Sequence, residues 1–152
     1  MASPAVEEDL LLEHQLCFAL SVASRSVVAA YKPVLDRLGL THPQYLVMLA
    51  LWEHSPRTVK ELGEVLLQEP ATLSPMLKRL EAAGLVTRSR VAGNERALAV
   101  GLTEAGTALR GQALSVPGTM LERLDLDRDG VRELNAAMRQ LIRAAQQAVA
   151  SD

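Results

Sequence analysis

Hydrophobic side chains recur along most of this chain at the three- and four-residue spacing of an α-helix. The first such stretch runs from residue 7 to residue 38, and its apolar side is formed by Leu12, Leu16, Leu20, Ala23, Val27 and Tyr31. Pro33 marks a kink or a restart, and Gly39 stands just after the last turn, where glycine commonly ends a helix. The pattern predicts a long N-terminal helix.

Two capping boxes open the helices that follow. Thr41 and Gln44 are three residues apart, as a capping box requires, and residues 45–53 are so densely apolar that we expect a central, buried helix. Thr58 and Glu61 repeat the arrangement ahead of a short helix, which residues 68–70 interrupt. These signals predict two successive helices with defined starts.

The next helix carries three leucines on its inner face and ends at Gly84; the leucines are Leu73, Leu77 and Leu80. Pro75 is expected in its first turn, where a missing N–H costs little.

From residue 96 the hydrophobic side chains recur at every second position, which is typical of a β-strand. Small residues alternate with Leu98, Val100 and Leu102. The expected partner strand is formed by residues 85–90, and the turn between the two strands by residues 92–95. Thr103 is expected to cap a helix that runs to about residue 123 with a bend at 117–118, and a last helix covers about 129–149.

This order of elements predicts a mainly α protein with a small β-hairpin, arranged as a winged helix-turn-helix. We expect a single domain over residues 1–152, with the winged helix-turn-helix at about 43–102 and dimerisation helices at about 7–40 and 104–150. The apolar side chains of these terminal regions exceed what a small helical module needs, which favours a homodimer; they are Leu10, Leu11, Leu12, Leu134, Met138, Leu141 and Val149.

In a winged helix-turn-helix the second helix presents polar side chains to the major groove of double-stranded DNA. The predicted DNA-binding residues of this helix and the hairpin are Thr72, Ser74, Pro75, Lys78, Arg79, Arg88, Arg90 and Arg96. Arg96 is near the hairpin tip and could enter the minor groove. Residues 70–96 hold five cations and two anions in a chain of net charge −2, so the positive charge is local. The alternative is an ordinary solvated surface.

The remaining composition narrows the class of protein. A single cysteine forms no intrachain disulfide, and no signal peptide or membrane span is visible, so we expect a cytoplasmic protein without membrane contact. Residues 125–130 copy half of a calcium loop, but Ala136 stands where the bidentate glutamate is needed. His14 and Cys17 are too few for a metal site, and no catalytic motif stands out. We therefore expect no metal, no cofactor and no enzymatic activity.

Several blocks of the chain resemble a known family. Residues 85–88 (Leu-Val-Thr-Arg), the hairpin and residues 102–106 (Leu-Thr-Glu-Ala-Gly) resemble the MarR family of winged-helix regulators. Residues 13–20, 31–33, 43–46 and 72–81 are more closely similar to its organic-hydroperoxide-sensing, one-cysteine branch, called OhrR. The resemblance implies a dimeric repressor of a palindromic operator that releases DNA when an organic hydroperoxide oxidises its N-terminal cysteine.

The resemblance implies that Cys17 is the redox-sensing residue, although a lone cysteine on an apolar helix is usually inert packing. Peroxide would convert its thiolate to sulfenic acid, which could then form a mixed disulfide with a low-molecular-weight thiol, bond to the other Cys17 or be over-oxidised. Tyr31 matches a family tyrosine that hydrogen-bonds the reactive cysteine; the alternative is an amphipathic interface residue. Fourteen residues of straight helix span about 21 Å, so that contact needs a second subunit or a chain that turns back at Pro33.

Three positions depart from the family pattern. His42 stands where a second cysteine-bonding tyrosine is common, and we expect a neutral imidazole to replace it; the alternative is a surface residue of the helix start. Ser21 replaces a third tyrosine, and Asn94 replaces an aspartate that orients the wing arginine, for which Glu95 could compensate. Two other functions stay open: a repressor relieved by a small aromatic or phenolic ligand with Cys17 silent, and a thiol peroxidase.

Overall fold

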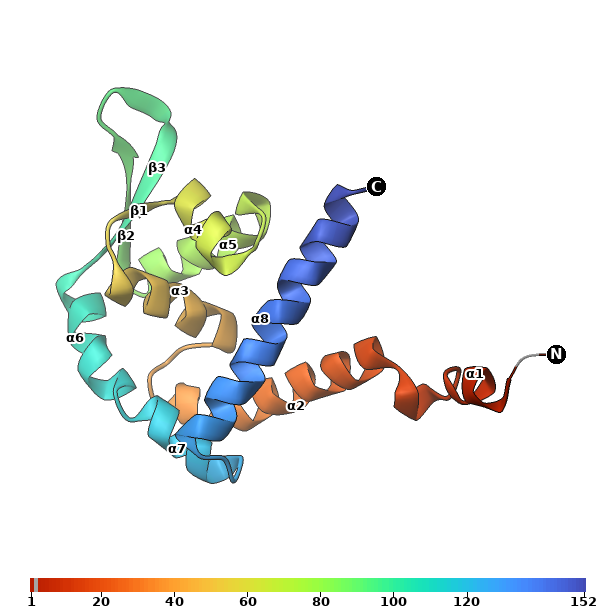
Figure 1. Cartoon of the computed structure of the whole chain (residues 1–152). Helices are drawn as coiled ribbons and strands as arrows, with labels where there is room; N and C mark the ends of the chain where they lie inside the picture. The colour runs from red at the N-terminus through yellow and green to blue at the C-terminus, as the bar shows by residue number, and fades with distance from the viewer. Residues whose placement is uncertain (2) are drawn as a thin grey trace. The chain divides into compact units, whose positions relative to one another are not determined.

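The computed structural model describes residue 1 and residues 3–152, with the backbone alone for residues 95 and 96. Its contacts divide the chain into two compact units, Met1–Leu114 and Ser115–Asp152. The first unit contains α1 (Pro4–Glu8), a 3-10 turn η1 (Leu12–His14), α2 (Leu16–Asp36), α3 (His42–Glu53), β1 (Arg57–Thr58), α4 (Val59–Leu66), α5 (Pro70–Ala82), β2 (Val86–Val91), β3 (Asn94–Leu102) and α6 (Glu104–Ala113). Figure 1 shows the β2–β3 hairpin extending away from α4 and α5.

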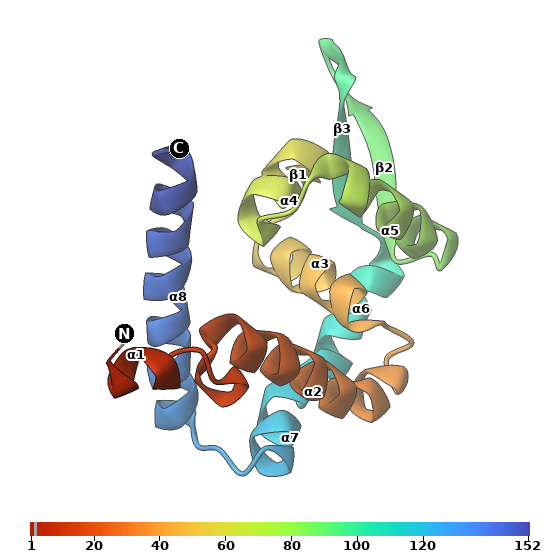
Figure 2. The same cartoon turned by 90° about the vertical axis from the view of Figure 1, so that its right-hand side faces the viewer.

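The core of the first unit forms around α3, as its apolar run predicted. Val47, Met48 and Leu51 are fully buried, and Leu62 of α4 joins them with the three inner leucines of α5. Figure 2 shows α3, α4 and α5 close to one another at the base of the strands. Both predicted capping boxes are confirmed, since Thr41 and Thr58 each accept a hydrogen bond from the backbone three residues later while Gln44 and Glu61 accept one in return.

Three short antiparallel strands form one sheet in the order β1-β3-β2. The hairpin pairs Val86 with Leu102 and Arg88 with Val100, and Gly93 takes a positive φ of 80° in the turn. Strand β1, which pairs Arg57 with Val100, was not predicted because two residues are too few to show a period.

A short motif after β3 fixes this sheet to the helices. Thr103 caps α6 by accepting from Gly106 N, and its hydroxyl donates to Gly84 O at 2.6 Å. Trp52 of α3 donates its indole N–H to Gly106 O at 2.9 Å. A Cβ atom on Gly106 would overlap the carbonyl oxygen of Leu85, so only glycine fits there. The Leu-Thr-Glu-Ala-Gly block is therefore a packing motif with a physical reason for its glycine.

Three predictions about helix ends were wrong. The N-terminal helix begins at Leu16 rather than at residue 7, because Gln15 donates its side-chain amide to Asp9 O and Leu11 O and so holds the preceding segment in a tight turn. The helix after Thr103 breaks at residues 114–115, between α6 and α7, and not at 117–118. Pro75 lies in the second turn of α5, since Pro70, which needs no N–H partner at a helix start, begins the helix five residues earlier.

The second unit contains α7 (Val116–Arg123) and α8 (Arg128–Ala150). Asp127 caps α8 by accepting from Gly130 N at 2.6 Å, so this acidic segment is a helix start. No residue of α8 is buried, although it is strongly amphipathic, and Leu134 is 50% exposed. The prediction of a last helix at about 129–149 is confirmed.

Candidate functional site

Helix α5 separates its apolar and polar side chains cleanly. Leu73, Leu77 and Leu80 are fully buried, whereas four of the predicted DNA-binding residues are exposed on the other side and Ser74 is half-buried; the four are Thr72, Pro75, Lys78 and Arg79. Two hydroxyls and two cations therefore occupy one accessible helix face, a set that suits phosphates and base edges.

The turn between α4 and α5 depends on a close backbone approach. A Cβ on Gly63 would lie 2.7 Å from the carbonyl oxygen of Gln68, and Leu67 ends α4 in the left-handed conformation with φ of 54°. This compact turn sets α5 directly after α4, which is the arrangement of a helix-turn-helix.

An ion pair joins the hairpin to α5. The guanidinium of Arg88 on β2 donates to Glu81 Oε1 at 2.9 Å, and this hydrogen bond lowers the pKa of the Glu81 carboxyl group. The Arg88 side chain is only 19% exposed, and its Nε is buried with no hydrogen-bond partner in the described part of the chain. Arg90 is exposed on the same strand. The side chain of Arg96 lies outside the described residues, as does that of Glu95.

Cys17, the single cysteine, is the second residue of α2 and is exposed to solvent. Tyr31 lies on the same helix, which continues through Pro33 to Asp36 without turning back. Fourteen residues of continuous helix separate their Cα atoms by about 21 Å. The structure thus removes one of the two predicted routes to a Cys17–Tyr31 contact and leaves the route through a second copy of the chain.

Three rings gather where the end of α2 meets the start of α3. The Tyr31 ring lies 5.0 Å from the His42 ring and 6.0 Å from the Tyr45 ring, measured between centroids. Burial raises the pKa of the Tyr31 and Tyr45 hydroxyls, the latter further through the charge of Tyr31, and burial lowers the pKa of His42. A lowered pKa favours the neutral form of the imidazole. That this imidazole takes the place of a cysteine-bonding tyrosine stays a prediction.

Tyr45 was not among the predicted site residues, because it belongs to an apolar run whose pattern indicates only a buried helix. Its position three residues after His42 was the available signal, since residues three apart share a helix face. Across the described part of the chain, no group of three or more His, Cys, Asp or Glu side chains could hold a metal ion. None of the described helices combines the length and apolar character needed to cross a membrane.

Comparisons with known proteins agree with this geometry. Residues 40–98 match the MarR family. The organic hydroperoxide resistance transcriptional regulator of Bacillus subtilis (strain 168) is 43% identical over 140 residues, which are 92% of this chain and 95% of the relative.

Solved structures of AbfR, a protein of Staphylococcus epidermidis, have the same fold. Reduced AbfR bound to DNA is 31% identical with a TM-score of 0.80, over 93% of this chain and 97% of that one. Disulfide-formed AbfR is 32% identical with a TM-score of 0.64, over 97% and 99% of the two chains. The predicted winged helix-turn-helix architecture is thereby confirmed, and the chain belongs to the MarR family of transcriptional regulators.

Proposed function

We propose that this protein is a homodimeric, DNA-binding transcriptional repressor that senses organic hydroperoxides through oxidation of Cys17 and then releases its operator. The observation that carries the proposal is the pairing of an exposed, single cysteine on α2 with a complete winged helix-turn-helix in one regulator chain. The similarity to a regulator of organic hydroperoxide resistance supports the choice of signal.

Helix α5 is the element that would enter the major groove. Its exposed Thr72, Lys78 and Arg79 offer a hydroxyl and two charged donors, and Ser74 and Pro75 complete the same face. The hairpin would carry Arg90 and Arg96 toward the neighbouring minor groove, while Arg88 keeps donors besides the one given to Glu81. Two copies of this surface, related by a two-fold axis, would read the two halves of a palindromic operator.

The sensing step is a reaction of one sulfur with one peroxide. The Cys17 thiolate attacks the terminal peroxide oxygen, an S–O bond forms as the O–O bond breaks, and the departing alkoxide takes up a proton to leave as an alcohol. The sulfur is oxidised to sulfenic acid and the hydroperoxide is reduced. A low-molecular-weight thiol can then condense with the sulfenic acid, releasing water and leaving a mixed disulfide.

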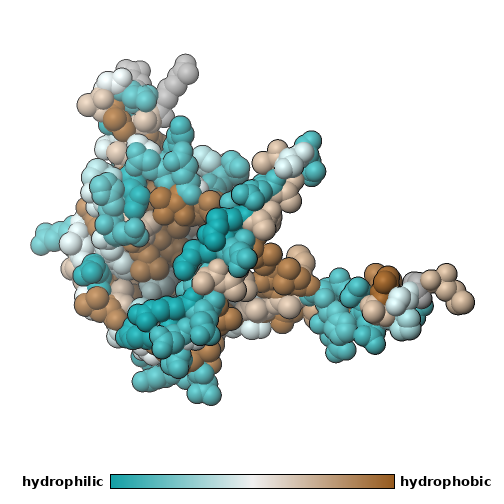
Figure 3. All heavy atoms as spheres, in the orientation of Figure 1, coloured by the Kyte–Doolittle hydropathy of each residue, from teal (hydrophilic) through white to brown (hydrophobic). Residues whose placement is uncertain are grey.

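The ring cluster, formed by Tyr31, His42 and Tyr45, is proposed to complete the Cys17 site of the other subunit. Since Cys17 cannot reach Tyr31 along its own helix, a Cys17–Tyr31 contact requires two chains. In the dimer, Tyr31 and His42 of one protomer would lie against Cys17 of its partner, with the neutral imidazole of His42 in place of a tyrosine hydroxyl. Apolar surface along α2 is available for such pairing (Figure 3), including exposed Leu16, Phe18 and Val22.

The decisive experiment measures binding to a duplex from the promoter region of the protein's own gene, before and after one equivalent of an organic hydroperoxide. We expect the wild-type protein to bind and then to release the duplex, and the Cys17→Ser variant to bind and not respond. Met76→Leu is the control, because Met76 on α5 is a second oxidisable side chain near the DNA-facing surface. It should respond like the wild type.

The same titration separates the alternatives. If Cys17→Ser still leaves DNA when an aromatic or phenolic compound is added, and hydroperoxide has no effect on the wild type, the sensing proposal is wrong. Consumption of many equivalents of peroxide per cysteine would instead indicate a peroxidase. His42→Phe is expected to slow oxidation of Cys17, whereas His54→Phe, a change at an exposed position, should not.

A further inference from the structure

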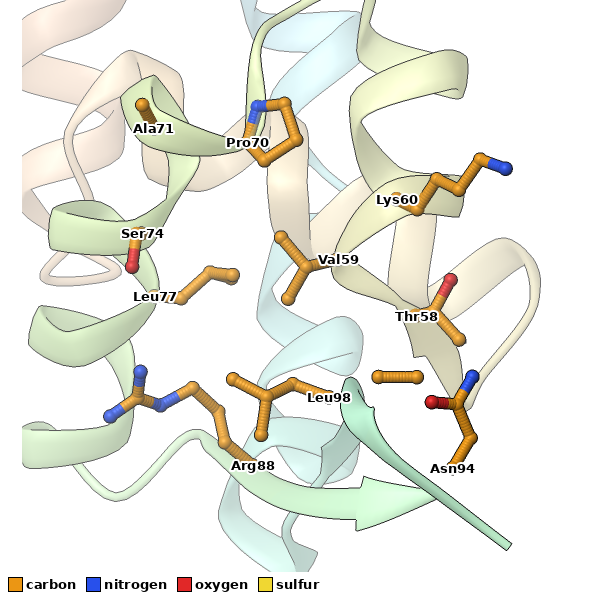
Figure 4. Close-up of a pocket in the computed structure, with 11 residues that line it drawn as sticks. Thr58, Val59, Lys60, Pro70, Ala71, Ser74, Leu77, Arg88, Asn94 and Leu98 are labelled. Atoms are coloured by element: carbon orange, nitrogen blue, oxygen red, sulfur yellow. The ribbon is translucent and has the colours of Figure 1, made fainter. Parts of the chain in front are cut away.

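A cavity of about 570 Å³ lies between the first half of α5, the start of α4 and the hairpin. Figure 4 shows Val59 and Leu77 pointing toward each other across it, with the stem of Arg88 and the side chain of Leu98 along the hairpin side. Lys60 extends outward from its rim. The cavity therefore has apolar walls and a basic residue at its mouth.

Of the two cationic side chains that line this cavity, one is paired with a carboxylate and, in the described part of the chain, the other is not. Arg88 is balanced by Glu81 at 2.9 Å, so it adds little net charge. Lys60 is exposed and makes no ion pair among the described residues. The carboxylate of Glu61, one residue further along α4, is turned back to accept from Thr58 N in the capping box. Ser74, also on the cavity wall, has a hydroxyl without a hydrogen bond in the described structure. The excess positive charge thus belongs to Lys60.

The shape of duplex DNA says what must lie here once α5 and the hairpin are bound. A major groove and its neighbouring minor groove are separated by a single sugar-phosphate strand. If α5 occupies the first groove and the hairpin tip the second, that strand has to cross the gap between them, and this cavity is lined by residues of both elements. Apolar walls suit deoxyribose, and a lysine and a hydroxyl suit phosphate oxygens.

We propose that this cavity seats the sugar-phosphate strand between the two grooves, and that Lys60 neutralises one of its phosphates. The inference rests on the proposed function and adds to it a DNA-binding residue outside α5 and the hairpin. Because a phosphate is the same at every base pair, Lys60 contributes affinity and register and no sequence preference.

The test is the salt dependence of DNA binding by the full-length protein, for the wild type, Lys60→Gln, Lys60→Arg and Lys32→Gln. The proposed homodimer carries two Lys60 side chains, so Lys60→Gln removes one phosphate contact from each subunit. The slope of log K against log salt should fall in magnitude by about 1.8, which corresponds to an affinity loss on the order of 60-fold at 0.1 M salt. We expect Lys60→Gln to show this loss on both the promoter duplex and an unrelated duplex, and Lys60→Arg to restore the slope. Lys32, which pairs with Asp36 on α2, is the matched control and should leave binding unchanged.

Two results would overturn the inference. One is a Lys60→Gln protein with wild-type affinity and slope; the other is a loss confined to the promoter duplex, which would mean a base contact. DNA binding by the wild-type protein distinguishes a failure of this inference from a failure of the proposed function. If it binds the promoter duplex and releases it on oxidation while Lys60→Gln is unaffected, only the role of Lys60 is wrong; if it binds no DNA, the proposed function itself is wrong.

Discussion

Helices α5 and α8 are both amphipathic, yet they use their apolar faces in different ways. The three inner leucines of α5 are fully buried within its own unit, whereas α8 buries no residue and leaves Leu134 half exposed. An apolar stripe stabilises a chain only when something covers it. The apolar face of α5 is thus covered within one chain, whereas that of α8 is left uncovered, and we propose that a second copy of the chain covers it.

The largest expected effect follows from truncating a buried leucine on the covered face of α5. Leu80→Ala should lower the free energy of unfolding by about 2–5 kcal/mol, because it removes a fully buried side chain and leaves a cavity. Denaturant unfolding measures the change. Leu49→Ala, at an exposed position of α3, is the control and should cost much less; equal losses for the two variants would contradict the assignment of the core.

A smaller effect is expected on the uncovered face. Leu134→Ala should raise the dissociation constant of the dimer by roughly tenfold or more, since burying a leucine at an interface contributes about 1.5–3 kcal/mol. Analytical ultracentrifugation over a dilution series measures it. Arg143 lies nine residues, or two and a half turns, further along α8 and so on its opposite face. If Arg143→Ala weakens the dimer as much as Leu134→Ala does, the proposed interface is on the wrong side of the helix.

The smallest effect concerns the ring cluster. Burial lowers the pKa of His42 below its usual value of about 6.5, so the unfolded chain takes up this proton before the folded chain does. The stabilising contribution is present above pH 6.5 and is lost as the pH falls through the folded-state pKa. Unfolding curves between pH 7 and pH 5 should show this loss. It should disappear in His42→Phe and persist in His54→Phe; the same slope in all three proteins would show that the His42 imidazole is not held neutral by burial.

Local sequence signals predicted the elements that depend on a few neighbouring residues. The capping residues Thr41, Thr58 and Thr103 and the glycine at position 39 fixed helix ends because their hydrogen bonds or positive φ are made within four residues along the chain. The inner leucines of α5 followed from periodicity for the same reason. Where the prediction failed, at residues 7–15 and at Pro75, a side chain or a second proline a few positions away offered a better alternative.

The sequence by itself determined the winged helix-turn-helix order, the identity of the single cysteine and the local excess of positive charge. Only the tertiary structure decided which side chains meet. In it the Tyr31 ring contacts the rings of His42 and Tyr45. Arg88 forms an ion pair with Glu81, and Lys60 lines a cavity together with residues of α5 and the hairpin. The tertiary structure also kept Cys17 and Tyr31 apart on one unbroken helix. The physical reason is that periodicity and caps act within a few residues, whereas these contacts join segments whose distance is set by how helices and strands pack.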